Sequence, residues 1–185
     1  MNELWMVRHG RTEWSAAGKH TSHTDVPLLP EGEEVARSLK SRLADVGFVQ
    51  VLTSPRLRAR RTAELAGFPD ATVEEDLVEW DYGAYEGVTT KEIRETVPGW
   101  TVWSHPVPGG ETSTEVQERL DRVVRRVREA DGPTLVFGHG HALRALAARW
   151  LDLPVTEGQH FQLDTATVSV LGWEHEAPTI RRWNA

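Results

Sequence analysis

Short apolar runs alternate with longer helical segments along the chain. Residues 3–8, ELWMVR, have the length and composition of a buried strand, and the runs 48–54, FVQVLTS, and 134–140, TLVFGHG, share them. The longer segments between and after these runs are expected as amphipathic helices. They cover residues 31–46, the stretch from Pro55 to about residue 66, residues 113–130 and residues 141–151. Strands that alternate with helices predict an α/β fold with a mostly parallel central sheet and helices on both faces.

The remaining segments carry weaker patterns. Residues 9–30 are rich in Gly, Ser, Thr, His and Pro and predict a long loop, which in a compact domain is more often functional than idle. Residues 76–110 hold little regular pattern beyond a short helix near 90–95, and residues 160–173 and 179–183 are expected as closing strands. The chain of 185 residues shows no repeat or linker, so we expect one domain over residues 1–185.

The amino-acid composition argues against several classes of function. The absence of cysteine excludes disulfides, thiolate metal sites and cysteine nucleophiles. A formal net charge of −7 argues against binding nucleic acid through a basic surface. No apolar run approaches the roughly 18 residues of a membrane span, and no signal peptide is visible at the N-terminus. We therefore expect a soluble cytoplasmic protein without membrane or nucleic-acid partners, and a homo-oligomer is compatible with this sequence.

Polar chemistry follows each of the apolar strands. The strand ends read Arg8-His9-Gly10, Thr53-Ser54 and Gly138-His139-Gly140. Ligands of parallel sheets bind beyond the carboxyl ends of the strands, so these ends are expected to share one edge of the sheet. That shared edge is the candidate site.

Three interpretations of His9 compete: a structural turn, a metal ligand, or a nucleophile beside an anion-binding arginine. An imidazole can attack phosphorus when positive donors surround the phosphoryl oxygens, and Arg8 is adjacent. His139 precedes a predicted helix, whose free N–H groups favour an anion. Arg58 is one of four arginines within residues 56–61, most of which are expected to face solvent.

A zinc site is the main alternative for the histidines. His139 and His141 form an H-x-H pair that His20 and His23 from the long loop could join. No Asp or Glu stands at a ligand spacing beside either pair, which disfavours zinc. We therefore expect no metal.

An acidic stretch rich in aromatic residues supplies a candidate general acid. In VEWDYGAYEG, residues 78–87, a carboxyl beside aromatic rings can have a raised pKa and donate a proton. Physical reasoning alone does not choose among the acidic residues of this region. They are Glu75, Asp76, Glu79, Asp81 and Glu86.

Four segments in order resemble a known family. VRHGRTEW, SPRLRARRTAEL, EWDYGAYEG and FGHGHALRAL are similar to the motifs of the histidine phosphatase superfamily, in the branch that includes cofactor-dependent phosphoglycerate mutase. The last three also resemble the subgroup that contains sedoheptulose-1,7-bisphosphatase and certain acid phosphatases. The resemblance implies that His9 is the phosphorylated nucleophile and Glu79 the acid and base. It also implies that Arg8, Arg58 and His139 complete the catalytic phosphate pocket.

The chain departs from the family pattern at several positions. Ser15 stands where the family usually has Asn, the pair Thr21 and Ser22 where Thr-Gly is common, and His141 where a second glycine is common. The resemblance places the following residues in the phosphate-binding and substrate-binding set: Arg8, His9, Ser15, Thr21, Ser22, Arg58, Tyr82, Gly140 and His141.

These observations predict a phosphomonoesterase that needs neither metal nor cofactor and acts on small phosphorylated metabolites, above all sugar phosphates. Arg11, Arg60 or Arg61 could meet a second phosphate group of such a substrate. The alternatives are a cofactor-dependent phosphoglycerate mutase and a phospholigand-binding protein without turnover. The length of the chain, and EWDYG where the mutases have ERHYG, favour the phosphatase.

Overall fold

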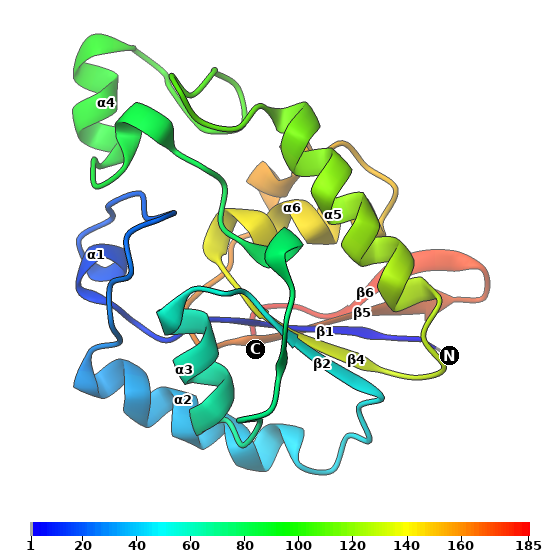
Figure 1. Cartoon of the computed structure of the whole chain (residues 1–185). Helices are drawn as coiled ribbons and strands as arrows, with labels where there is room; N and C mark the ends of the chain where they lie inside the picture. The colour runs from blue at the N-terminus through cyan, green and yellow to red at the C-terminus, as the bar shows by residue number, and fades with distance from the viewer. Residues whose placement is uncertain (1) are drawn as a thin grey trace.

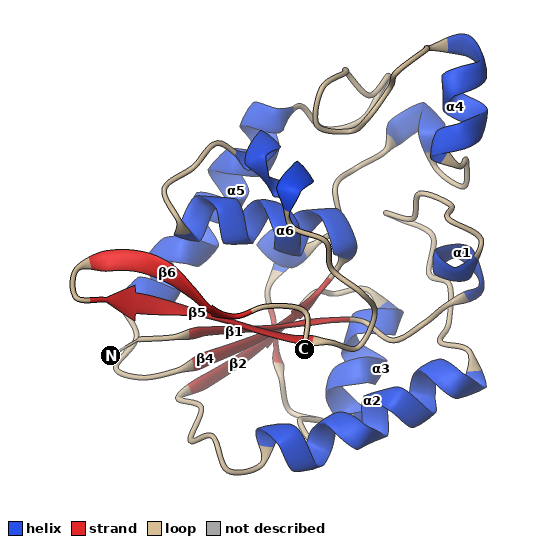
Figure 2. Ribbon diagram, turned by 180° about the vertical axis from the view of Figure 1, so that it is seen from behind, coloured by secondary structure: helices blue, strands red, loops and turns tan. Residues whose placement is uncertain are grey.

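In the computed structural model, which describes residues 2–185, six strands form one sheet in the order β3-β2-β4-β1-β5-β6. The pairs that join the first four of these strands are parallel, and the last two strands pair antiparallel, which confirms the mostly parallel sheet. Figure 2 shows β5 and β6 as a hairpin at one side of the sheet. The strands are β1 (Leu4–Arg8), β2 (Gln50–Thr53), β3 (Thr72–Val73), β4 (Thr134–Gly138), β5 (Val168–Glu174) and β6 (Ala177–Arg182).

Helices cover both faces of the sheet, as expected. α2 (Pro30–Leu43) and α3 (Leu57–Leu65) lie on one face, and α5 (Ser113–Arg128) and α6 (Gly140–Trp150) lie on the other (Figure 1). Side chains alternate between the faces along each strand, so Met6 packs with α5 and α6 whereas Val7 packs with α2 and α3. The apolar stripes of the four helices and the two faces of the sheet therefore form two core layers.

Two short helices lie beyond the carboxyl ends of the strands (Figure 1). They are α1 (Glu13–Ala16) and α4 (Thr90–Thr96), and three 3₁₀ turns cover Glu75–Leu77, Gly83–Tyr85 and Val155–His160 in the described part of the chain.

The differences from the sequence-based elements have local causes. The long loop contains α1, because Thr12 and Ser15 cap this single turn reciprocally. β3 has only two residues, both exposed, and so leaves no hydrophobic pattern to detect. The expected strand over 160–173 was wrong in its first half, since strand pairing begins only at Val168.

Parallel pairing brings the three polar strand ends together. Arg8 is in register with Gly138, and the backbone N–H of His9 continues that ladder by donating to the Gly138 carbonyl at 3.0 Å. The backbone N–H of Ser54 donates to Phe137 O at 2.9 Å on the other side of β4. The expected shared edge is confirmed.

Two glycines fix the chain immediately after β1. A Cβ atom on Gly10 would lie 2.6 Å from the carbonyl oxygen of Gly32, and one on Gly32 would lie 2.3 Å from the Arg11 carbonyl oxygen. Both contacts are with backbone, which cannot rotate away as a side chain would. The start of α2 therefore packs directly on the loop that follows His9.

We expect Gly10→Ala to destabilise the protein by about 1–3 kcal/mol, because the added methyl group overpacks a backbone contact. Gly47→Ala is the matched control, since a Cβ atom there meets nothing within 4 Å. Chemical denaturation of both variants measures the difference. Equal stability of the Gly10 variant and the wild-type protein would show that the loop moves freely away from α2.

Candidate active site

A cavity of about 210 Å³ opens where the carboxyl ends of β1 and β4 meet. Its wall combines the strand ends with the long loop, the acidic aromatic segment and the first turns of α6. The lining residues are Arg8, His9, Ser15, Gly18, Lys19, His20, Thr21, Glu79, Tyr82, Thr90, Gly140, His141 and Arg144.

The imidazole of His9 is held in one tautomer. Its Nδ1 lies 2.7 Å from the carbonyl oxygen of Gly10, and since a carbonyl only accepts, Nδ1 carries the proton. Burial, followed by the charges of Arg58 and Arg8, lowers the pKa of His9 well below its ordinary value of 6.5. The ring is therefore neutral at pH 7 and keeps a lone pair on Nε2, which is the form that a nucleophile requires.

The half-buried Arg8 and the buried Arg58 supply fixed positive charge near His9. Arg8 donates from Nη1 to the Leu163 carbonyl at 2.6 Å, and Arg58, which is fully buried, donates to the carbonyls of Thr24 and Thr21 at 3.0 Å each. Burial lowers the pKa of both arginines, although guanidinium groups stay protonated in proteins. The structure thus buries Arg58 alone of the four clustered arginines. The other three are Arg56, Arg60 and Arg61.

His139 is a neighbour of His9, and the two ring centroids are 5.3 Å apart. It is fully buried, and its Nε2 is 2.7 Å from the Ser54 hydroxyl. Within residues 2–185, its Nδ1 and the Nε atoms of Arg8 and Arg58 are among the few buried side-chain polar atoms without a hydrogen-bond partner. Leaving a buried polar group unpaired costs about 1–3 kcal/mol. Of these three residues Arg8 lines the cavity, whereas Arg58 and His139 do not, so their contact with a ligand stays a prediction.

Glu79 is the acidic residue of its region that lines the cavity. Its Oε1 accepts from the backbone N–H groups of Trp80 at 2.9 Å and Ala142 at 2.7 Å, and its Oε2 accepts from that of His141 at 3.0 Å. The carboxylate thus caps the N-terminus of α6, where a helix favours negative charge. Glu79 also raises the pKa of Arg8 by Coulombic attraction, which partly offsets the lowering of that pKa by burial.

The other acidic candidates point to different partners. Asp76 pairs with Arg122, Asp81 with His23, and the Glu86 carboxylate accepts from Ser22 and Thr24 in the long loop. Glu75 starts the first 3₁₀ turn and does not line the cavity. The anionic group expected at the N-terminus of α6 is therefore, in this structure, the carboxyl group of Glu79.

Tyr82 and His141 form a hydrogen-bonded pair in the cavity wall, between the phenol oxygen and Nδ1. Burial and the Glu79 carboxyl group raise the pKa of Tyr82 well above its ordinary value, so the phenol keeps its proton. Burial lowers the pKa of His141 well below 6.5, which keeps this ring neutral.

The three hydroxyl residues expected to bind phosphate are engaged with the protein itself. The Ser15 hydroxyl exchanges hydrogen bonds with the backbone of Thr12, and that of Thr21 donates to Lys19 O at 3.1 Å. Ser22 does not line the cavity, and its hydroxyl donates to Glu86 at 2.6 Å. Ser15 and Thr21 do line it, and their contact with a ligand stays a prediction.

The cavity also contains residues that the sequence analysis did not assign to it. Arg144 lies one helical turn after Gly140, which is the signal that could have identified it, and its guanidinium stacks on Trp103 with 4.9 Å to the ring centroid. Lys19 and His20 come from the long loop. By contrast, the arginines considered for a second phosphate do not line the cavity. They are Arg11, Arg60 and Arg61, and Arg61 pairs with Glu33 and Glu64.

The histidines weighed as zinc ligands have separate partners. His20 stacks against His141 at 6.0 Å, His23 pairs with Asp81, and His139 binds Ser54. Over residues 2–185, no three His, Cys, Asp or Glu side chains form a group that could hold a metal ion. Within the same residues, no helix has the length and apolarity to cross a membrane.

Residues 4–185 match the family model described as Histidine phosphatase superfamily (branch 1). The chain belongs to this family. His9, whose neutral ring lies near Arg8 and the buried Arg58, lies at the sheet edge predicted from the polar strand ends.

Individual relatives agree with this membership. The chain is 40% identical over 178 residues to an acid phosphatase of Mycobacterium tuberculosis, covering 94% of this chain and 88% of the relative. It is 37% identical over 183 residues to sedoheptulose 1,7-bisphosphatase of Saccharomyces cerevisiae, covering 81% and 68%. The solved structure of a Mycobacterium tuberculosis open reading frame product superposes with a TM-score of 0.95 at 38% identity, covering 99% and 97%. This histidine phosphatase therefore shares its fold with that structure along nearly its whole length.

The histidine cluster predicts that this histidine phosphatase loses stability on mild acidification. Burial lowers the pKa values of His9, His139 and His141, so the unfolded chain binds more protons than the folded one below about pH 6.5. Each such histidine reduces the free energy of unfolding by up to about 1.4 kcal/mol per pH unit below that value. Denaturant titrations between about pH 7 and about pH 5.5 measure the slope.

Two variants test whether the buried histidines cause this pH dependence of the free energy of unfolding. His139→Gln removes one buried titrating ring and should flatten the profile, whereas His175→Gln changes a side chain that is 85% exposed and should leave the slope unchanged. A flat profile in the wild-type protein would mean that the histidines are protonated in the folded state.

Proposed function

We propose that residues 1–185 form one histidine phosphatase domain that hydrolyses small phosphomonoesters through a phosphohistidine on His9. The observation that carries this proposal is the hydrogen bond from His9 Nδ1 to Gly10 O, 2.7 Å long. It leaves the basic Nε2 of a neutral ring at the cavity, with the guanidinium groups of Arg8 and Arg58 close enough to lower the pKa of His9.

In the first step, His9 Nε2 attacks the phosphorus atom and the bond from phosphorus to the leaving oxygen breaks. The leaving oxygen takes a proton from the carboxyl group of Glu79 and departs as an alcohol. Arg8, Arg58 and His139 face the negative oxygens of the phosphoryl group, where fixed donors contribute most to the rate. Their unpaired Nε and Nδ1 atoms are the donors available for this purpose.

In the second step, water attacks phosphorus and the bond from phosphorus to His9 Nε2 breaks. Glu79, now a carboxylate, takes the proton of the water, and inorganic phosphate leaves. The cycle ends with a neutral His9 and with the proton of the water on Glu79, which passes to the leaving oxygen of the next substrate. The cycle consumes one water per phosphomonoester and needs neither metal nor cofactor.

The substrate class follows from the relatives and from the cavity. An acid phosphatase and a sedoheptulose 1,7-bisphosphatase are among the similar proteins, which supports phosphorylated sugars and related metabolites as substrates. Tyr82, His141 and Gly140 line the cavity together with Arg8 and His9 and are proposed to contact the substrate. A Cβ atom at position 140 would lie 3.3 Å from the Arg8 guanidinium carbon, so Gly140 keeps room beside that group.

The setting proposed for this activity is the cytoplasm, where phosphorylated sugars are made and used. A nucleic-acid partner is not part of the proposal, because the net charge of −7 opposes binding to a polyanion. A homo-oligomer is compatible with the proposal, since a single chain supplies the whole cavity.

Rapid quench with a radiolabelled phosphomonoester should trap acid-labile label on His9, because a phosphohistidine precedes hydrolysis. His9→Gln should lose both label and turnover. The control is His160→Gln, which alters a histidine side chain that is 66% exposed and should keep both. Label on another residue, or normal turnover in the His9 variant, would overturn the mechanism.

The products separate a phosphatase from a mutase and from a binding protein. Sedoheptulose 1,7-bisphosphate should release inorganic phosphate with a chelator present and without 2,3-bisphosphoglycerate, since water is the acceptor. Faster isomerisation of 3-phosphoglycerate than release of phosphate would favour the mutase. Tight binding of phosphate without any turnover would favour the binding protein.

A further inference from the structure

Arg119 is a buried arginine of α5 that does not line the cavity. Its Nη1 donates to two backbone carbonyls, that of Asp76 at 2.8 Å and that of Val78 at 2.9 Å. These carbonyls belong to the irregular segment that leads into Glu79. A guanidinium group of α5 thus holds the segment on the N-terminal side of Glu79.

The opposite edge of the same guanidinium binds Glu111. Arg119 Nε donates to Glu111 Oε1 at 2.7 Å and Nη2 donates to Oε2 at 3.0 Å, which is a bidentate ion pair. Glu111 in turn accepts the backbone N–H of Asp81 at 2.9 Å through Oε2, and its backbone carbonyl accepts the indole N–H of Trp80 at 3.0 Å. Glu111 therefore holds the segment on the C-terminal side of Glu79.

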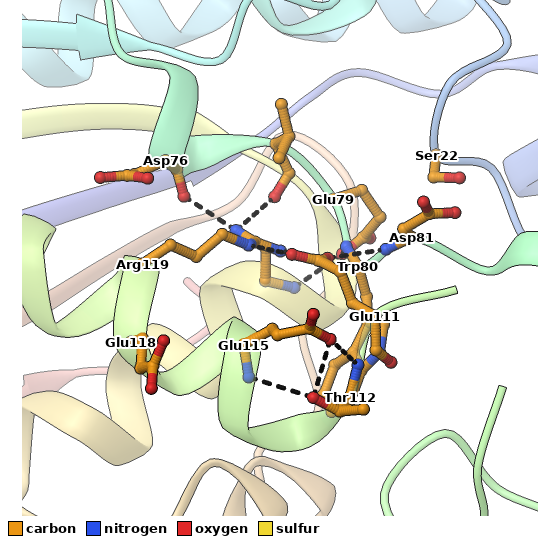
Figure 3. Close-up of polar contacts among 12 residues, drawn as sticks. Ser22, Asp76, Glu79, Trp80, Asp81, Glu111, Thr112, Glu115, Glu118 and Arg119 are labelled. Atoms are coloured by element: carbon orange, nitrogen blue, oxygen red, sulfur yellow. Dashed lines mark hydrogen bonds and ion pairs between the residues drawn. The ribbon is translucent and has the colours of Figure 1, made fainter. Parts of the chain in front are cut away.

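Figure 3 shows how the two residues enclose the segment that carries Glu79. The backbone is fixed before Glu79 and after it by one ion pair between the buried Arg119 and the half-buried Glu111, and the carboxyl group of Glu79 is fixed at the start of α6. Residues 78–81 have no helix or strand of their own to hold them. Arg119 and Glu111 take the place of a regular ladder of backbone hydrogen bonds.

The cost of burying this pair indicates a role beyond stability. A buried ion pair contributes little net folding energy compared with apolar side chains of similar size. Arg119 occupies a position in the apolar stripe of α5, between Val116 and Leu120. Proton transfer, by contrast, is sensitive to position, and a shift of about 1 Å in a catalytic group can cost about 100-fold in rate.

We propose that Arg119 and Glu111 are positioning residues that set the place of the Glu79 carboxyl for proton transfer to the leaving oxygen. This inference rests on the proposed function, since it assigns a support to the acid of that mechanism. Neither residue touches the substrate in this scheme. Both act through the backbone on either side of Glu79.

The test compares two leaving groups in single-turnover phosphorylation of His9. A sugar alkoxide needs the proton of Glu79, whereas p-nitrophenolate leaves readily without it. In Arg119→Lys a single ammonium replaces the fork, and in Glu111→Gln the ion pair is lost. Both variants should slow phosphorylation by radiolabelled sedoheptulose 1,7-bisphosphate by roughly 10- to 100-fold. Both should nearly spare the burst of p-nitrophenolate from p-nitrophenyl phosphate.

Two controls define the result. Arg122→Gln is matched, because Arg122 is on the same helix and binds the Asp76 carboxylate, but its side chain is 53% exposed and both rates should stay unchanged. In the double variant Arg119→Lys with Glu79→Gln, the sugar phosphate should react no more slowly than with Glu79→Gln alone. Non-additivity of this kind shows that Arg119 acts through Glu79.

The outcomes separate this inference from the proposed function. Suppose that Glu79→Gln discriminates between the leaving groups. The positioning role is then overturned if Arg119→Lys and Glu111→Gln slow both substrates equally, or if they slow neither. If Glu79→Gln itself slows both substrates equally, the assignment of Glu79 as the acid fails, and the positioning role fails with it. Glu111→Gln keeps the test decisive if the Arg119 variant does not fold.

Discussion

The parallel hydrogen bonds between β1 and β4 are the frame to which the other parts of the site are added. They set Arg8 opposite Gly138, so that His9 and His139 leave adjacent strands at the same height. The proposed nucleophile His9, one arginine and the start of α6 are therefore fixed by the sheet and not by a flexible loop. The long loop and the acidic aromatic segment add their residues to this fixed edge.

Electrostatics follow from that placement. Burial makes a protonated histidine costly beside Arg8 and Arg58, and the same burial strengthens the pull of these arginines on an incoming anion. The arginines tolerate burial because carbonyl oxygens of Leu163, Thr21 and Thr24 accept their hydrogen bonds. The site is thus positively charged where phosphate is proposed to bind, and Glu79 supplies the acidic side chain of the cavity wall.

The sequence predicts the parts of the molecule that repeat a pattern over many residues. The strand at 134–138 and the helix that ends at Arg128 follow from apolar spacing, whereas α1 depends on a local cap between Thr12 and Ser15. The histidines and Arg8 could be placed at one edge because parallel strands share their direction. The partners of Ser22 could not, since its bond to Glu86 joins segments 64 residues apart. Arg119 resembles an ordinary helix charge in sequence, and only its place in an apolar stripe marks it as buried.

The hydrogen bonds of Glu79 to the backbone of His141 and Ala142 have a consequence for the reaction cycle. A carboxylate accepts these bonds more strongly than a neutral carboxyl group does. In the proposed cycle, each proton that Glu79 gives or takes must therefore change the strength of two hydrogen bonds to amide groups in the first turn of α6. The backbone of this helix is in this way coupled to the protonation of a side chain that lies 61 positions before it begins.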